Sequence, residues 1–407
     1  MIETWPTDRD LWDDWYDIAK ACLISDSRDL GPAHNFYIEN REAMDAGAKL
    51  YWEGRVTAGY ISALESAMAK YYTDPVTFAA EYQNQPLDLV NADVEMPPID
   101  VLVSQMSAVP RLKIPDWATH VTAMIDVQGK LLYYGVKAWA DQFTGAVVDY
   151  GTWPDQGRAY FSLQDARRTF FRERPGAGFE GCLHYAIHQL MDKLEGQAWV
   201  REDGTKMRLT AGLIDANYGQ STDVVYAAVG ERKNSIWVPS HGRGVKATHQ
   251  PLNATAPKKG EARGPGWYMP RLDKAQRPVR HVTYDTNWWK SFVAGRWAIA
   301  VPERGHQTFF ADGRHRMYAE HLNAEYAVKV STDRRECLEW FEKPNLDNHY
   351  LDIDVGCAVA ASIAGVKMEE LGPENKRKRK VKRVTAENLK NSDFFKKHSP
   401  ITSSLNR

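Results

Sequence analysis

The sequence predicts an α/β protein in which a mixed β-sheet is flanked by helices, with a helical subdomain before it and a basic tail after it. Strand-like and helix-like runs alternate between residues 118 and 365, which is typical of this fold class. Residues 1–95 contain mostly helix-like runs, and residues 376–383 are basic except for one valine. With 407 residues, 43% of them hydrophobic, the chain can bury one large core with appendages.

We place the helical subdomain at 1–95, the α/β domain at 96–367 and a basic flexible tail at 368–407. In the first region, apolar and aromatic residues indicate four helices and no set of strands, at about 11–19, 36–44, 62–72 and 75–83. Prolines at positions 97, 98, 110 and 115 mark the boundary with the next domain.

The α/β domain begins with an antiparallel meander, because β-branched and aromatic runs are separated by polar turns. We expect its strands at 118–126, 131–139 and 146–153. The later strands are expected at 208–215, 235–239 and 281–284, with a hairpin near 327–341. Helices are expected at 160–173, 180–195, 222–231, 286–297, 314–325 and 352–365. Residues 240–266, rich in glycine, lysine, arginine and proline, are predicted to form a mobile surface loop.

Composition excludes several classes of protein. The 52 basic and 53 acidic residues nearly cancel, so no overall field attracts nucleic acid. The four cysteines show no CxxC spacing and are expected to be reduced thiols without a zinc site of their own. No secretory signal is visible, and no apolar run approaches the roughly 18 residues of a membrane span. No Walker-type phosphate loop occurs, so we expect any associated ATPase activity to reside elsewhere.

Three aspartates carry the main indication of chemistry. Asp126 and Asp215 end apolar strands, in Met124-Ile125-Asp126 and Leu213-Ile214-Asp215, and Asp352 opens a small-residue helix. Hydrolysis of a phosphodiester by two metal ions requires ions about 3.5–4 Å apart, held by carboxylates on rigid elements. Mg²⁺ or Mn²⁺ suits such oxygen ligands. Taken singly, each aspartate has another interpretation, as a turn residue or a helix cap.

Asp354 competes with Asp352 for the place of the third ligand. It is two residues further along the same predicted helix, where it could instead be an acid that favours the helix dipole. The two side chains are separated by roughly 200° around the helix axis, so they cannot easily share one ion. This arrangement corresponds to a ribonuclease-H-like plan: one strand carries Asp126, a neighbouring strand carries Asp215, and a helix crosses the edge of the sheet.

At these residues the chain resembles the nuclease portion of the large terminases of tailed bacteriophages. Ile125-Asp126 resembles the segment of the first metal-binding acid, Leu213 to Gly219 that of the second, and Asn348 to Asp352 that of the third. Residues 36–48, 78–86 and 284–290 are also similar to terminase segments. The resemblance implies a ribonuclease-H-like fold and metal-dependent cleavage of double-stranded DNA during genome packaging. It also favours Asp352 over Asp354 as the third ligand.

The resemblance implies further partners as well. A large terminase carries its ATPase upstream of the nuclease, so we expect this chain to work with a terminase ATPase domain or subunit. The small terminase subunit and the portal protein are further expected partners, in the cytoplasm of a phage-infected or lysogenic bacterium. The expected cofactor is a pair of Mg²⁺ or Mn²⁺ ions.

Six basic or titratable residues are candidates for contact with DNA phosphate, which cationic side chains bind without sequence preference. They are Arg243, Lys246, Lys258, Lys259, Lys290 and His349. The alternatives are a solubilising loop for the first four, a solvated helix lysine for Lys290 and a turn-capping histidine for His349. The basic run at 376–383 is expected to bind DNA, to dock on the portal, or to be an inert tail.

Two other functions fit the same residues. One is a different ribonuclease-H-like nuclease, such as a transposase or a junction resolvase. The other is a packaging or portal adaptor that keeps the fold without catalysis, which the three acids argue against.

Overall fold

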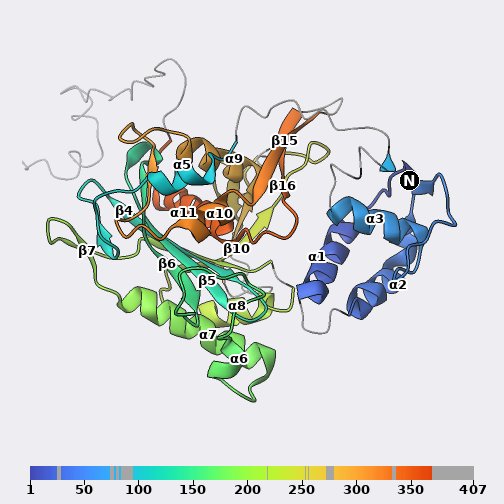
Figure 1. The fold of residues 1–407 in the computed structure, drawn as a ribbon, viewed down its shortest axis with the longest axis horizontal. Helices are drawn as coiled ribbons and strands as arrows, with labels where there is room; N and C mark the ends of the chain where they lie inside the picture. The colour runs from blue at the N-terminus through green and yellow to red at the C-terminus, as the bar shows by residue number, and fades with distance from the viewer. Residues whose placement is uncertain are drawn as a thin grey trace, which may run out of the picture. The chain divides into compact units, whose positions relative to one another are not determined.

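A mixed β-sheet of nine strands forms the centre of the part of the chain that the computed structural model describes, with helices against both of its faces (Figure 1). The described residues are 1–24, 29–73, 78, 82–83, 95–217, 219–252, 254, 256–271, 279–331 and 336–368. The predicted tail at 368–407 lies outside them, apart from Met368. Within the described ranges, every helix is too short or too polar to cross a membrane.

The strand order of the sheet is β11-β12-β13-β10-β9-β4-β5-β6-β14. Its centre consists of four parallel strands, which are β13 (Val282–Asp285), β10 (Trp237–Arg243), β9 (Ala211–Asp215) and β4 (His120–Val127). The predicted meander is confirmed, since β5 (Leu132–Trp139) and β6 (Gly145–Trp153) continue antiparallel from β4. The outer strands are β11 (Ala262–Gly264), β12 (Trp267–Met269) and β14 (Gln307–Thr308). The four parallel strands therefore end at one common edge, where open α/β sheets bind their ligands.

Side chains alternate between the two faces of the sheet and fill two separate cores. Met124 and Leu213 belong to the core beneath α9 (Thr286–Trp297), α10 (Arg316–Leu322) and α11 (His349–Ala364). Ile125 and Ile214 belong to the core that contains α7 (Gly178–Gly196) and α8 (Thr222–Gly230). Because helices cover both faces, β4 and β5 are buried along almost their whole length. The predicted fold class, a ribonuclease-H-like mixed sheet flanked by helices, is confirmed.

The N-terminal region contains three of the four predicted helices. They are α1 (Asp10–Ile24), α2 (Gly31–Asp45) and α3 (Ala63–Thr73), which pack around Trp12, Trp15 and Tyr37. The fourth, expected at 75–83, lies mostly outside the described residues. The expectation that this region lacks strands was wrong, because β1 (Ile2–Thr4) pairs with β2 (Lys49–Leu50). Strands this short cannot show the alternation by which a sequence reveals them.

Two predictions within the α/β domain need correction. Only α6 (Phe170–Glu173) forms in the stretch expected to be helical at 160–173. The Gln156 side chain accepts the backbone N–H groups of residues 167 and 168 and donates to the carbonyl of Arg168, which satisfies this backbone without a helix. The stretch predicted as one long loop at 240–266 instead contains the end of β10 and all of β11, both within the sheet.

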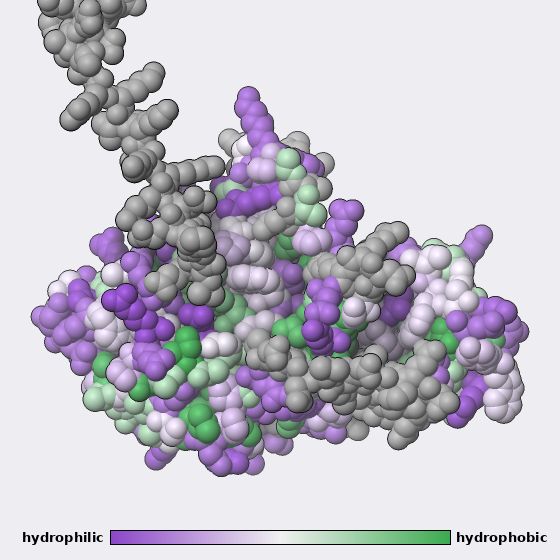
Figure 2. All heavy atoms as spheres, turned by 90° about the horizontal axis from the view of Figure 1, so that it is seen from above, coloured by the Kyte–Doolittle hydropathy of each residue, from purple (hydrophilic) through white to green (hydrophobic). Residues whose placement is uncertain are grey.

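The remaining elements surround the main sheet. The hairpin expected near 327–341 is confirmed as β15 (Glu325–Ser331) with β16 (Glu336–Glu342). A separate small sheet and two short helices complete the described structure: β3 (Lys113–Ile114), β7 (Trp199–Arg201), β8 (Lys206–Met207), α5 (Ile99–Ser104) and a 3-10 helix at Asp141–Phe143. On the face shown in Figure 2, hydrophilic side chains predominate and the hydrophobic ones form small scattered patches.

Candidate active site

Asp126 and Asp215 lie side by side at the carboxyl edge of the parallel strands. β4 and β9 pair in parallel with Ile125 opposite Ile214, so the next residue on each strand is one of the two acids. The residues before the isoleucines, Met124 and Leu213, point into the core beneath α11. Because side chains alternate along a strand, Asp126 and Asp215 point to that same face.

Asp352 reaches this edge from α11. The helix begins at His349 and packs against β4, β5 and β9, so its first turn carries Asp352. Burial, together with Asp126 and then Asp352, raises the pKa of Asp215 well above its usual value of 3.8. Burial also raises the pKa of Asp352 to about 6, although Lys290 opposes this. The three carboxylates are therefore close enough to repel one another.

Lys290 holds Asp352 rather than facing solvent. It extends from α9, and its Nζ lies 2.5 Å from Oε1 of Glu325 and 3.2 Å from Oδ1 of Asp352. Glu325 also accepts a hydrogen bond from Asn348, the residue before α11. Burial would lower the pKa of Lys290, but Asp352 and Glu325 keep it above its usual value. The Lys290 side chain is 11% exposed and already pairs with two acids, while its contact with DNA phosphate stays a prediction.

His349 and Gln128 hold Asp126. Nδ1 of His349 lies 3.0 Å from Oδ2 of Asp126, and its Nε2 lies 4.0 Å from Oδ1 of Asp347. Gln128 donates to both oxygens of Asp126. Burial opposes protonation of His349, but Asp126 raises its pKa above the usual value. His349 is 7% exposed and contacts the first acid, while its contact with DNA stays a prediction.

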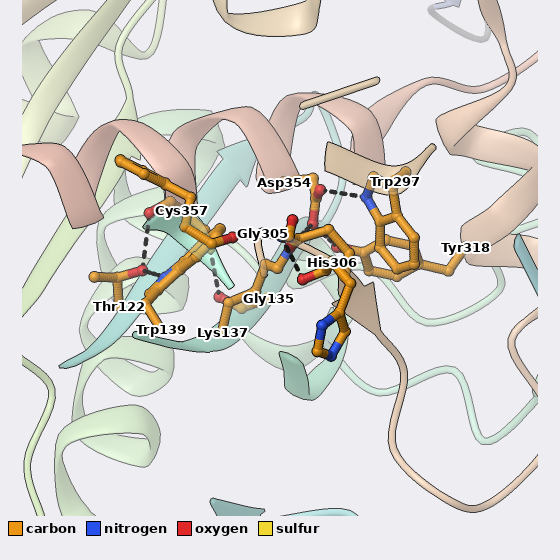
Figure 3. Close-up of polar contacts among 12 residues, drawn as sticks. Thr122, Gly135, Lys137, Trp139, Trp297, Gly305, His306, Tyr318, Asp354 and Cys357 are labelled. Atoms are coloured by element: carbon orange, nitrogen blue, oxygen red, sulfur yellow. Dashed lines mark hydrogen bonds and ion pairs between the residues drawn. The ribbon is translucent and has the colours of Figure 1, made fainter. Parts of the chain in front are cut away.

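Asp354 lies in a different environment from the other three acids. Its carboxylate is buried beneath the opposite side of α11, 2.6 Å from Nζ of Lys137 (Figure 3). Tyr318 donates to the same oxygen, and Trp297 donates to the other. Both oxygens are thus already engaged in the core. These contacts favour Asp352 over Asp354 as the third ligand, and the choice between them stays a prediction.

The four basic candidates of the 240–266 stretch differ in their surroundings. Arg243 ends β10 three residues beyond Ser240, which lies opposite Asp215, so it is at the acid edge of the sheet. Lys246 pairs with Asp13 of α1 at 3.0 Å. Lys258 and Lys259 are exposed at a turn. The structure therefore places Arg243 on the same edge of the sheet as Asp215 and leaves two lysines accessible.

Several residues at the site were not found from the sequence. Gln128 follows Asp126 by two positions, which could have suggested its role, but Glu325 and Asp347 carry no local signal. Tyr133 lies opposite Asp126 on β5, and its ring stacks on His349 with centroids 4.3 Å apart. The buried Tyr133 hydroxyl has no protein hydrogen-bond partner.

The surroundings of the three acids suit divalent cations. They offer hard oxygen ligands, and burial with mutual repulsion raises the pKa values of Asp215 and Asp352, which a bound cation would reverse. In the described part of the chain the three acids do not form a group whose ligand atoms all lie within 4.8 Å of one another. Ligands for two ions about 3.5–4 Å apart need not be that compact.

Comparison with known proteins identifies one family. Residues 91–374, more than half of the chain, match the sequence model described as terminase large subunit gpA, endonuclease domain. The match covers the central sheet and all three acids. No curated protein and no solved structure matches the chain.

Proposed function

This chain belongs to the family of terminase large subunit gpA endonuclease domains, and we propose that it cuts double-stranded DNA with divalent metal ions held by Asp126, Asp215 and Asp352. The observation that carries the proposal is the parallel register of β4 and β9, which places two acids next to each other, with the first turn of α11 supplying the third. The family favours a packaging nuclease over a transposase or a junction resolvase.

Each acid has its own support within the protein. His349 and Gln128 orient Asp126, and Lys290 orients Asp352. The backbone N–H of Asn217 donates to Oδ1 of Asp215. Such supporting contacts fix the direction of carboxylate oxygens and typically change metal affinity or activity 10- to 100-fold when removed.

Two Mg²⁺ or Mn²⁺ ions bound there would activate the attacking water and stabilise the leaving oxygen of the phosphodiester. The three acids would hold them, and Asp354 would take no part because Lys137, Trp297 and Tyr318 occupy its oxygens. Arg243, Lys258 and Lys259 are proposed to bind the DNA backbone. Lys246 would contribute less because it pairs with Asp13.

In this proposal the natural substrate is concatemeric viral DNA in the cytoplasm of the host bacterium. The proposed partners are a terminase ATPase domain or subunit, the small terminase subunit and the portal protein. The family membership supports DNA and other packaging components as partners.

A plasmid assay tests the proposal. Supercoiled plasmid should be nicked and linearised with Mn²⁺ or Mg²⁺, and EDTA should stop the reaction. Asp126→Asn should abolish cleavage, because it removes a charged ligand while keeping the shape of the side chain. Asp223→Asn is the matched control, since Asp223 is exposed on α8, beneath the other face of the sheet. Cleavage that persists in EDTA, or an active Asp126→Asn variant, would reject the metal-dependent mechanism.

A further inference from the structure

A second group of possible metal ligands lies on the face of the sheet opposite α11. His184 and His188 are on α7, and Glu231 follows the last residue of α8. Because α7 and α8 pack on the other core from α11, this group is separate from the three acids. It takes no part in the proposed DNA cleavage.

Both imidazoles point at the same carboxylate. Nε2 of His184 lies 3.1 Å from each oxygen of Glu231, and Nε2 of His188 lies 3.0 Å from Oε2. One ligand atom from each of the three residues can be chosen so that all three atoms lie within 4.8 Å of one another. In the described ranges, no other group of three or more histidine, cysteine, aspartate or glutamate residues meets this condition. Ligands at about 2.0–2.2 Å from a tetrahedral ion lie roughly 3.3 Å apart. Small side-chain rotations would therefore admit an ion.

The two helices prearrange these ligands. Residues 184 and 188 are four apart on α7, so their side chains share one face of the helix. α8 ends at Gly230, and the partial negative charge at a helix C-terminus favours a cation beside Glu231. Arg232 is a positive charge nearby, but it pairs with Asp192 and Glu195 of α7. Its charge is thereby largely balanced.

The donor types select the kind of metal. Imidazole nitrogen with one carboxylate suits Zn²⁺ and similar transition metals, whereas Mg²⁺ prefers carboxylates and water. The His184, His188 and Glu231 side chains are 33%, 22% and 55% exposed, which leaves one side open to water.

We propose that His184, His188 and Glu231 bind one Zn²⁺ ion, completed by water, that ties α7 to the end of α8. The coordination would be the three-ligand type with an open position. The ion would hold α7 and α8 together in the helical layer that covers the face of the sheet opposite α11.

Zinc titration in excess Mg²⁺ tests this site, because Mg²⁺ competes for the proposed carboxylate site and has little affinity for imidazole nitrogen. Isothermal titration calorimetry should show one Zn²⁺ per wild-type chain and none for His184→Gln/His188→Gln, in which glutamine preserves helix propensity. Co²⁺ should give visible absorption bands with the wild type and not with the double variant. His120→Gln, on the first residue of β4, is the control and should bind as the wild type does.

The outcomes separate this site from the nuclease. The double variant should keep Mg²⁺-dependent plasmid cleavage, and Zn²⁺ should raise the melting temperature of the wild type only. Should the double variant not fold, Glu231→Gln at its exposed position gives the same test, with binding weakened at least tenfold. Equal Zn²⁺ binding by wild type and variants, or no binding by wild type, would overturn the proposal and leave a hydrogen-bonded surface cluster.

Discussion

Lys290 lies 3.2 Å from Asp352 while it also contacts Glu325 at 2.5 Å, so one buried ammonium group joins α9, β15 and the first turn of α11. From the sequence, this lysine was a candidate for contact with DNA phosphate, with a solvated helix lysine as the alternative. The structure instead gives it two acidic partners within the protein. We therefore expect Lys290 to affect cleavage by orienting the carboxylate of Asp352.

Lys290→Met should lower the rate of plasmid cleavage about 10- to 100-fold, the usual effect of losing a residue that orients a metal ligand. Asp352 would lose its nearest cation, and Glu325 would be left without it. Cleavage is measured against Mn²⁺ concentration. We expect the Mn²⁺ requirement to rise while the dissociation constant for DNA stays the same.

Lys206→Met is the matched control, because Lys206 is exposed on β8. It should leave both quantities unchanged. If Lys290→Met instead weakened DNA binding at an unchanged Mn²⁺ requirement, the direct phosphate contact expected from the sequence would be restored.

Asp215 gives a prediction about stability and pH. Its pKa in the folded protein lies well above the value of 3.8 that it takes when unfolded. The unfolded state therefore binds fewer protons between these two pKa values, and stability falls as pH rises through that window. Asp215→Asn removes this penalty. In EDTA, the variant should melt at a higher temperature than the wild type at pH 8, and the advantage should shrink toward pH 4.

Adding Mn²⁺ at pH 8 should reverse the order. The ions would stabilise the ionised wild type by binding only the folded state, and the variant would gain less. Differential scanning fluorimetry measures both series. If the variant melted above the wild type by the same number of degrees at pH 4 and at pH 8, repulsion among the acids would not be the source of its extra stability.

The sequence predicted those parts of the site that depend on single strands and failed where distant chain segments meet. Asp126 and Asp215 were identifiable because each ends an apolar run, and parallel neighbours then bring them together. Helix geometry already placed Asp352 and Asp354 on different sides of α11, but which side faces the other two acids became visible only once α11 was placed on the sheet. The partners Glu325 and Asp347 come from a hairpin and a turn, so only tertiary packing reveals them. The same holds for β11 and β12, which are too short to carry a pattern.

Asp354 should matter for stability and not for the metal. Its oxygens accept from Lys137, Tyr318 and Trp297, all buried. Asp354→Ala would leave a buried, unpaired ammonium group, which typically destabilises a protein by about 3–5 kcal/mol. Urea unfolding should report a loss of this size, whereas the Mn²⁺ dependence of any remaining activity should not change.

A double variant separates the charge from the packing. Lys137→Met with Asp354→Leu replaces the pair by apolar groups and should recover much of the lost stability, since such exchanges are often neutral. Asp223→Ala serves as the exposed control and should change the free energy of unfolding by less than about 1 kcal/mol, since it removes only a first-turn acid of α8. A loss below about 1 kcal/mol for Asp354→Ala would contradict the role assigned to this ion pair.

The basic residues should differ in their contribution to DNA affinity according to their partners. Each phosphate contact contributes about −0.9 to the slope of log K against log salt concentration. Lys258→Gln/Lys259→Gln, measured by fluorescence anisotropy in the inactive Asp126→Asn background, should reduce the magnitude of that slope by up to about 2. Lys246→Gln should change it less, because Asp13 already neutralises Lys246. If Lys246→Gln reduced the magnitude of the slope more than the double variant did, this order would be contradicted. The ion pair between Lys246 and Asp13 would then have to open when DNA binds.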